Sequence, residues 1–161
     1  MENLKLTRID FRLIHGQVMT RWVSKYEIES IVVIDDRSAK SPILKKILLG
    51  AAPSGVKVIV WSIAEAVEKW NADGFPKNNL LILFKNTTSA KTSWEAGVKY
   101  QALQVGGIEG SGDKKNIYKN VVMSKTEAEE LKVLHDGGVQ VFMQPIPEDN
   151  PYPFKDVLAK F

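Results

Sequence analysis

The side chains best suited to chemistry stand close together in residues 8–17, which read RIDFRLIHGQ. His15 is the only histidine of this segment, and Arg12 lies three residues before it. A neutral imidazole has a free nitrogen lone pair that can attack phosphorus, and a guanidinium offers a planar fork of donors to phosphoryl oxygens. This combination predicts a phosphoryl-binding site in which His15 is the nucleophile.

Three other residues of the segment have more than one interpretation. Arg8 can bind phosphate, but its position inside a predicted strand makes a structural salt bridge equally consistent. Asp10 can accept a hydrogen bond from the imidazole and fix its tautomer, can steady Arg12, or can only shape the turn. Gly16 either lets the backbone approach a ligand closely or simply eases the turn into a helix.

Short apolar runs rich in β-branched residues predict strands that are buried on both faces of a parallel sheet. They lie near residues 4–9, 30–35, 56–61, 79–85, 102–106, 120–123 and 139–143. Apolar residues recur at helical spacing near residues 16–26, 41–51, 63–73, 89–98 and 125–136. In the second of these helices the stripe expected to face the core is Ile43, Leu44, Ile47 and Leu48. The alternation predicts an α/β fold, a three-layer α/β/α sandwich with a mainly parallel central sheet.

This fold defines where His15 lies. The residue falls between the first strand and the first helix, at the carboxyl edge of the sheet, where open α/β folds bind ligands. N–H groups at the start of a helix bind anions, and their partial positive charge opposes protonation of a nearby imidazole. We therefore expect a phosphoryl group to rest on the start of the first helix, beside a neutral His15.

The rest of the chain carries weaker signals. His135 precedes two glycines where a helix is expected to end, so a favourable interaction with the helix dipole explains it. The glycine-rich stretch Gly106 to Lys115 can cradle an anion, although a plain surface loop is the favoured interpretation. Prolines keep residues 145–153 extended, and a short final helix at 154–161 can dock through its apolar side chains.

Length and composition exclude several classes of protein. A chain of 161 residues fits one domain, residues 1–161, and the absence of cysteine excludes thiol catalysis and cysteine metal sites. The 22 Lys and Arg residues exceed the 19 Asp and Glu residues by only three, which does not indicate nucleic-acid binding. Charges within residues 1–13 and the shortness of the apolar runs predict neither an export signal nor a spanning helix. We expect a cytoplasmic protein without a metal or a cofactor.

The motif RID at 8–10, followed by RLIHGQV at 12–18 and TRW at 20–22, resembles the enzyme IIB subunits of the mannose, fructose and sorbose class of sugar phosphotransferase systems. Further matches are IVV at 31–33 before two aspartates, LLILF at 80–84 before Asn86, and VGG at 105–107. The resemblance covers nearly the whole chain. It departs where relatives often have Asn-Pro or Gly-Lys-Thr, since this chain has NT at 86–87 and GDKK at 112–115.

The resemblance implies a protein-phosphohistidine–sugar phosphotransferase in which Nδ1 of His15 transiently carries the phosphoryl group. Arg12 would be the main phosphate-binding side chain, and the backbone from Ile14 to Gln17, including Gly16, would complete the cradle. The group would come from phosphoenolpyruvate through enzyme I, the histidine phosphocarrier and enzyme IIA. It would pass to a sugar held by the membrane subunits IIC and IID, with which this protein would associate peripherally.

The resemblance does not determine the docking surface, the sugar or the oligomeric state. A homo-oligomer is one of the alternatives that it leaves open. An apolar docking rim for IIA and IIC can be formed by Phe11, Leu13 and Met19, although ordinary packing is slightly favoured.

Two other function classes remain. Asp35 and Asp36 follow the second predicted strand, so a receiver-like signalling module phosphorylated on one of these carboxylates has the same alternation of elements. Acidic residues are also common turn formers, and such an acceptor is expected after the third strand. A dinucleotide-dependent or hydrolytic enzyme is disfavoured, because neither Gly-x-Gly-x-x-Gly nor Gly-x-Ser-x-Gly follows the first strand.

Overall fold

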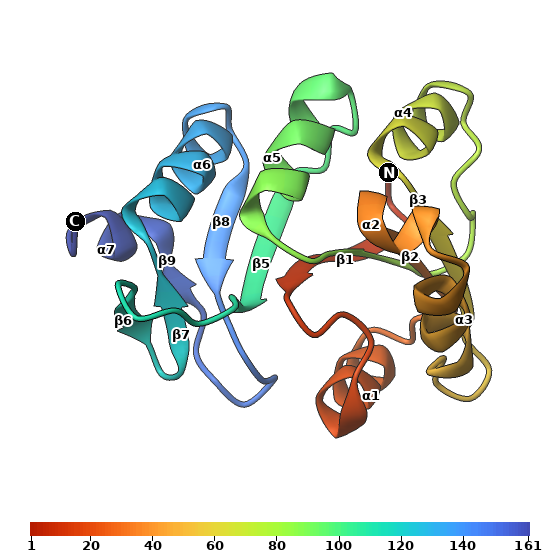
Figure 1. Ribbon diagram of the computed structural model, residues 1–161, viewed down its shortest axis with the longest axis horizontal. Helices are drawn as coiled ribbons and strands as arrows, with labels where there is room; N and C mark the ends of the chain where they lie inside the picture. The colour runs from red at the N-terminus through yellow and green to blue at the C-terminus, as the bar shows by residue number, and fades with distance from the viewer.

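The computed structural model describes residues 1–161 and contains a seven-stranded sheet with helices on both faces (Figure 1). The strands of this sheet are β1 (Leu4–Asp10), β2 (Ser30–Ile34), β3 (Lys57–Trp61), β4 (Leu80–Phe84), β5 (Ala102–Gly107), β8 (Gln140–Met143) and β9 (Tyr152–Pro153). Their order is β3-β2-β4-β1-β5-β8-β9, and only the pairing of β8 with β9 is antiparallel. The expected α/β sandwich with a mainly parallel sheet is confirmed.

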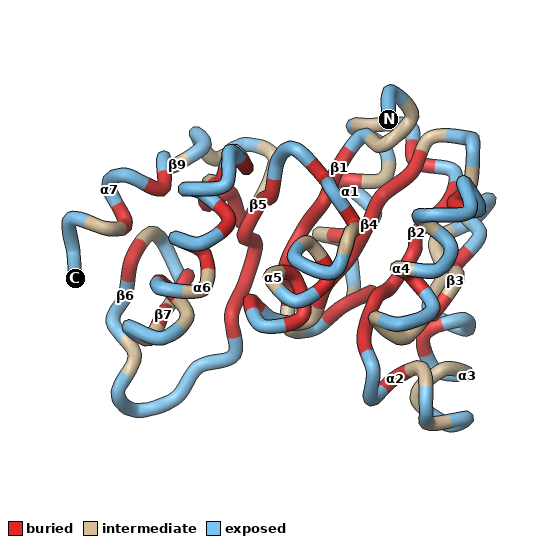
Figure 2. Tube along the Cα trace, turned by 90° about the horizontal axis from the view of Figure 1, so that it is seen from above, coloured by how far each residue is buried: buried red, intermediate tan, exposed pale blue.

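Two hydrophobic cores lie against the two faces of the sheet. One core contains residues of α1 (Gly16–Lys25) and α3 (Pro42–Gly50), and the other contains residues of α4 (Ile63–Asn71), α5 (Thr87–Ala96), α6 (Lys125–Asp136) and α7 (Phe154–Leu158). Successive residues of β4 alternate between these cores, so Ile82 joins one and Leu83 the other. Figure 2 shows the central strands as the most continuously buried part of the chain. Burial on both faces explains why the strand sequences are unbroken apolar runs.

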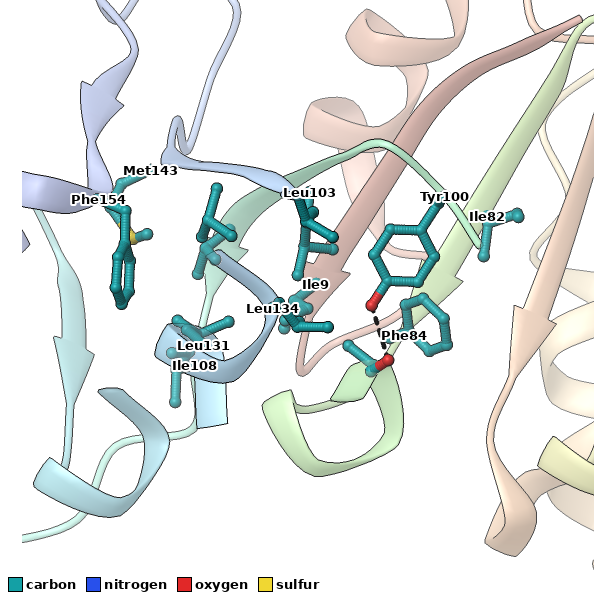
Figure 3. Close-up of a cluster of buried hydrophobic side chains, with 14 of the residues drawn as sticks. Ile9, Ile82, Phe84, Tyr100, Leu103, Ile108, Leu131, Leu134, Met143 and Phe154 are labelled. Carbon is teal, nitrogen blue, oxygen red and sulfur yellow. Dashed lines mark hydrogen bonds between the residues drawn. The ribbon is translucent and has the colours of Figure 1, made fainter. Parts of the chain in front are cut away.

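The core beneath α5 and α6 combines aliphatic and aromatic side chains from β1, β4 and β5 (Figure 3). Its one buried phenol, Tyr100, lies against Phe84 and donates a hydrogen bond of 2.6 Å from its hydroxyl to the carbonyl oxygen of Ala90. Burial raises the pKa of Tyr100 above its ordinary value. The phenol therefore stays neutral and serves as a fixed link between α5 and the sheet.

The elements differ from the prediction in two places. The expected helix at 41–51 is observed as α3, with Ser41 as its N-cap and Pro42 at its start, but it is preceded by a short helix that was not predicted, α2 (Asp36–Lys40), which Asp35 caps. The expected strand at 120–123 is β7 (Val121–Met123), which pairs only with β6 (Lys115–Tyr118) in an antiparallel hairpin outside the central sheet. The cap at Asp35 produces the extra helix, and the turn at residues 119–120 joins β6 to β7. Hydrophobic periodicity detects neither feature.

The stripe predicted to face the core along α3 is only half correct. Leu48 is buried and Leu44 is half-buried, but Ile43 and Ile47 are 73% and 60% exposed. The helix therefore carries apolar residues around most of its circumference, and only one side of it meets the sheet.

The carboxyl-terminal segment follows the prediction only in its final helix. The proline-rich stretch does not stay extended, because the chain turns at residues 146–149, where the amide of Asp149 donates to the carbonyl oxygen of Ile146 at 3.1 Å. After the short strand β9, α7 docks through Phe154 and Val157, which are both buried. Among the described residues 1–161, no helix has the length and apolar character needed to cross a membrane.

Candidate functional site

The site is formed where β1 ends and the chain turns into α1. The turn is fixed by Asp10, whose carbonyl oxygen accepts from the Leu13 amide at 2.9 Å and whose Oδ1 accepts from the Arg12 amide at 3.2 Å. Leu13 and Gly16 adopt positive φ angles of 57° and 43°. A left-handed conformation at a leucine costs roughly 1–2 kcal/mol, and the buried Leu13 side chain offsets that cost by packing in the core.

Beneath the turn lies a fully buried ion pair between Arg8 and Asp10. The Arg8 guanidinium donates to Asp10 Oδ2 at 3.2 Å, to Gln104 Oε1 at 2.5 Å, and to the carbonyl oxygens of Gln144 and Pro145, each at 2.9 Å. Burial lowers the pKa of Arg8 to about 10, although the neighbouring Asp10 carboxylate acts in the opposite direction. The group therefore remains charged at neutral pH and anchors Asp10 from below.

A glycine on the neighbouring strand makes room for this guanidinium. A Cβ atom on Gly106 would lie 2.0 Å from Cζ of Arg8, so any other residue at that position would displace the guanidinium. Gly106 and Gly107 belong to β5, and they are not part of the loop that the sequence predicts from Gly106 onward. Gly106 thus reports close packing over Arg8, whereas Gly110 and Gly112 lie in an exposed loop after β5, which is the favoured interpretation of that stretch.

Arg12 holds the other side of the same carboxylate. Its Nε lies 3.0 Å from Asp10 Oδ1 and its Nη2 lies 3.2 Å from Asp10 Oδ2, so the contact is bidentate. The side chain is 39% exposed and lies 5.4 Å from the centre of the Phe11 ring. Unlike Arg8, Arg12 keeps part of its donor fork open to a ligand while Asp10 fixes its orientation.

His15 is the N-cap residue of α1 and is partly buried. Its Nδ1 lies 2.9 Å from the carbonyl oxygen of Leu13, and its Nε2 lies 3.8 Å from Asp10 Oδ2. Two acceptors cannot face each other at 2.9 Å, so Nδ1 carries a proton in this arrangement and the lone pair of a neutral ring resides on Nε2. Nε2 is buried and has no hydrogen-bond partner in the protein.

The start of α1 differs from that of every other long helix. Of the five helices with nine or more residues, α3, α4, α5 and α6 have a serine or asparagine side chain that accepts from a first-turn amide, whereas α1 has none. The first N–H groups of α1, from Gly16 to Val18, therefore carry their full partial positive charge beside His15. Gly16 and Gln17 are both exposed.

The structure gathers most of the predicted residues into one place. Asp10, Arg12, His15, Gly16 and Gln17 surround the start of α1. Arg8 lies below them with no exposed surface, which supports its structural interpretation and leaves no face of the guanidinium open to phosphate.

The proposed docking rim is not supported in full. Leu13 and Met19 are only 4% and 1% exposed, because both pack into the core beneath α1, and only Phe11 is half-buried.

The aspartates of the alternative site are already occupied. Oδ2 of Asp35 accepts from the amide of Ser38 at 3.1 Å and from its hydroxyl at 2.5 Å, and the residue is buried. Oδ1 of Asp36 accepts from the amide of Ile63 at 2.8 Å. Both carboxylates thus serve helix starts, which is the turn-forming interpretation.

Several site residues were not predicted. Gln104 and Gln144 are buried, and together with the Pro145 carbonyl they complete the surroundings of Arg8. A glutamine inside the apolar run of β5 is the one signal in the sequence that could have shown a buried polar cluster. His135 lies in the last turn of α6, as predicted, and lines a separate cavity of about 930 Å³ between β8 and the residues before β9.

Comparison with known proteins gives one consistent family. Residues 4–161 match the family described as "PTS system sorbose subfamily IIB component". The fructose-specific EIIB component of Bacillus subtilis is 30% identical over 158 residues, which cover 98% of this chain and 97% of that protein. The mannose-specific EIIAB component of Escherichia coli is also 30% identical, and the match covers 96% of this chain and 48% of that longer protein.

Solved structures agree with the sequence matches. The crystal structure of manxB from Thermoanaerobacter tengcongensis superposes with a TM-score of 0.90 at 35% identity, over 98% of this chain and 96% of that one. The IIB domain of the sorbose permease from Klebsiella pneumoniae gives a TM-score of 0.89 at 27% identity, over 98% of both chains.

Proposed function

The chain belongs to the sorbose subfamily of PTS IIB components, and from this premise we propose that His15 is the residue that carries the phosphoryl group during sugar uptake. The observation that supports this most directly is the start of α1, where uncapped amides, a half-exposed arginine and an imidazole converge. Each of these groups suits a dianionic phosphoryl group, and no other long helix of the chain combines them.

The phosphoryl group would be held by groups that already point at its position. The first amides of α1 would donate to its oxygens, and the open part of the Arg12 fork would add charge-assisted hydrogen bonds. Phosphoryl transfer depends mostly on alignment and on stabilising charge over the equatorial oxygens. A rigid turn with fixed donors therefore supplies what the reaction needs.

The transfer to His15 requires the ring to move. The resemblance to IIB subunits implies Nδ1 as the acceptor atom, but Nδ1 faces the Leu13 carbonyl oxygen at 2.9 Å. We propose that the ring turns away from this carbonyl when the donor docks and that its proton passes to Nε2. Asp10 Oδ2, now 3.8 Å from Nε2, would accept that N–H and favour the tautomer with a free Nδ1 lone pair.

The complete reaction is a pair of exchanges. In the first, a bond forms between a ring nitrogen of His15 and phosphorus while the donor histidine of enzyme IIA loses its bond to the same phosphorus. In the second, an oxygen of the sugar replaces His15 on phosphorus and the hydroxyl proton is released. The membrane subunits IIC and IID would present the sugar, and the protein would act at the cytoplasmic side of that transporter.

The test is a phosphorylation assay with the whole relay. The purified chain is incubated with phosphoenolpyruvate, enzyme I, the phosphocarrier and an enzyme IIA of the same class, and the label is mapped by peptide mass spectrometry. We expect an acid-labile, base-stable label on His15, none on the His15→Ala variant, and an unchanged label on the His135→Ala variant. A label that persists on His15→Ala, or one that is lost in base, would refute the proposal.

A further inference from the structure

The outer side of α3 is an exposed apolar surface that the phosphoryl site does not use. Ile43, Ile47 and Leu49 are 73%, 60% and 46% exposed, and they are three of the six large hydrophobic side chains that the chain exposes. The other three are Met1, Val133 and Phe161, which lie far apart in the sequence. Figure 2 shows α2 and α3 at one corner of the molecule, with little buried chain.

The same two helices, α2 and α3, carry unpaired positive charge. Arg37 and Lys40 of α2 and Lys46 of α3 are exposed, and Lys45 is half-exposed. None of these four side chains forms an ion pair. The only acidic residue from 36 to 50 is Asp36, whose carboxylate is bonded to the amide of Ile63. We call these exposed residues, Arg37, Lys40, Ile43, Lys45, Lys46, Ile47 and Leu49, the α3 ridge.

The composition of the ridge indicates what it contacts. Protein interfaces are enriched in aromatic residues, methionine and arginine and are depleted in lysine. The helix α3 reads PILKKILLG, so it offers only aliphatic side chains and lysines and has no side chain that gives directional, neutral hydrogen bonds. Aliphatic residues that enter the acyl boundary, with lysines that reach the headgroups, are the composition of a helix lying on a membrane surface.

We propose that the α3 ridge binds directly to an anionic phospholipid bilayer. The four unpaired cations match the negative headgroups, and the three exposed aliphatic side chains enter the interface between them. A single helix of nine residues gives weak, reversible binding, which suits a carrier that must also meet a donor away from the membrane. The binding does not depend on His15 or on the phosphoryl group.

A sedimentation assay tests this with the full chain. Vesicles of equal parts phosphatidylglycerol and phosphatidylcholine should bring the protein down, vesicles of phosphatidylcholine alone should not, and added salt should weaken the binding. Replacing Lys45 and Lys46 by glutamine should weaken the partition about fivefold for each lysine. Replacing Ile43 and Ile47 by serine should weaken it about tenfold.

The helix α6 provides matched controls. The variant Lys125→Gln with Lys132→Gln removes the same net charge from exposed positions of α6, although Lys132, unlike Lys45 and Lys46, is paired with Asp136. Val133→Ser removes an aliphatic side chain that is 40% exposed. Both controls should bind vesicles like the unaltered chain. All variants change exposed or half-exposed side chains, so their thermal unfolding should stay close to that of the unaltered chain.

Three outcomes would overturn the proposal. Equal binding to neutral and anionic vesicles would show that the lysines do not contribute. If the α6 variants lost as much vesicle binding as the ridge variants, net charge and not the ridge would explain the binding. Failure of the unaltered chain to sediment with anionic vesicles at low salt would remove the proposal altogether. If light scattering instead shows a dimer that Ile43→Ser with Ile47→Ser dissociates, the ridge is covered by a second copy and not by lipid.

Discussion

Two strand-to-helix junctions of this molecule share a backbone geometry and differ in which polar groups they leave unpaired. The N-cap residue of α1, His15, has φ and ψ of −151° and 139°, and the N-cap residue of α2, Asp35, has −156° and 116°. Both junctions follow the carboxyl end of a buried parallel strand. Asp35 bonds both the amide and the hydroxyl of Ser38, whereas His15 bonds no amide of its helix. Because both junctions lie at the same edge of the sheet, only the unpaired donors distinguish the first as the candidate site.

The two junctions also differ in backbone strain. Leu13 has a positive φ angle of 57°, which is unfavourable for a residue with a Cβ atom, while no residue from 30 to 50 has a positive φ. Strain of this kind persists only where the surroundings hold it, and it concentrates at functional sites. At the first junction the buried pair of Arg8 and Asp10 provides that support from below. The second junction needs no such support because its carboxylates satisfy the helix start.

The largest effect on transfer is expected from the arginine that faces the site. Arg12→Ala should slow phosphoryl transfer by about 10²–10³-fold, because it removes a fixed charged donor from the developing negative charge. The matched control is Arg21→Ala, since Arg21 belongs to α1, is 42% exposed, comparably to Arg12, and pairs with Glu148 and not with Asp10. Rapid-quench measurement of the label on His15 gives both rates. If both variants slow transfer equally, general positive charge and not the Arg12 fork is responsible.

The next effect separates the buried arginine from the exposed one. Arg8→Lys should lower the free energy of unfolding by about 3 kcal/mol, because one ammonium cannot replace a guanidinium that bonds a carboxylate and several carbonyls in the core. Arg12→Lys should change it by less than about 1 kcal/mol, since that side chain is partly exposed. Urea unfolding followed by circular dichroism measures both. Equal losses of stability would show that Arg8 does not differ from Arg12 as the buried arginine that anchors Asp10.

Much of this comparison could be predicted from the sequence, and the exceptions have physical causes. The alternation of apolar runs predicted the layers, and the position of His15 between a strand and a helix led to the candidate site. Periodicity could not show that Ile43 and Ile47 face outward, because the apolar stripe of α3 is wider than the side of the helix that meets the sheet. The sequence also left Arg8 with two interpretations, phosphate binding or a structural salt bridge, since its burial depends on Gly106 and Pro145, which lie far along the chain.

A smaller effect, on stability alone, is expected at the second junction. Asp35→Ala should lower the free energy of unfolding by about 1–2 kcal/mol, because the Ser38 amide loses its cap. The rate of phosphoryl transfer to His15 should not change. Asp35→Asn keeps one acceptor oxygen and should recover most of the stability. Loss of the label in Asp35→Ala, with the label retained in His15→Ala, would instead make the second junction the phosphoryl acceptor.

The smallest expected effect tests whether α1 lacks a side-chain N-cap because its first amides bind the phosphoryl group. His15→Ser places a side chain that can accept from the Val18 amide at a position whose extended backbone already suits an N-cap. Relative to His15→Ala, it should therefore raise the free energy of unfolding by about 1 kcal/mol, and neither variant should accept a phosphoryl group. Ser124→Ala, which breaks the capping box of α6, should lower stability by a similar amount and serves as the calibration. If serine and alanine at position 15 give equal stability while Ser124→Ala is destabilising, the first amides of α1 are already satisfied in solution, and the anion cradle proposed for them loses its physical basis.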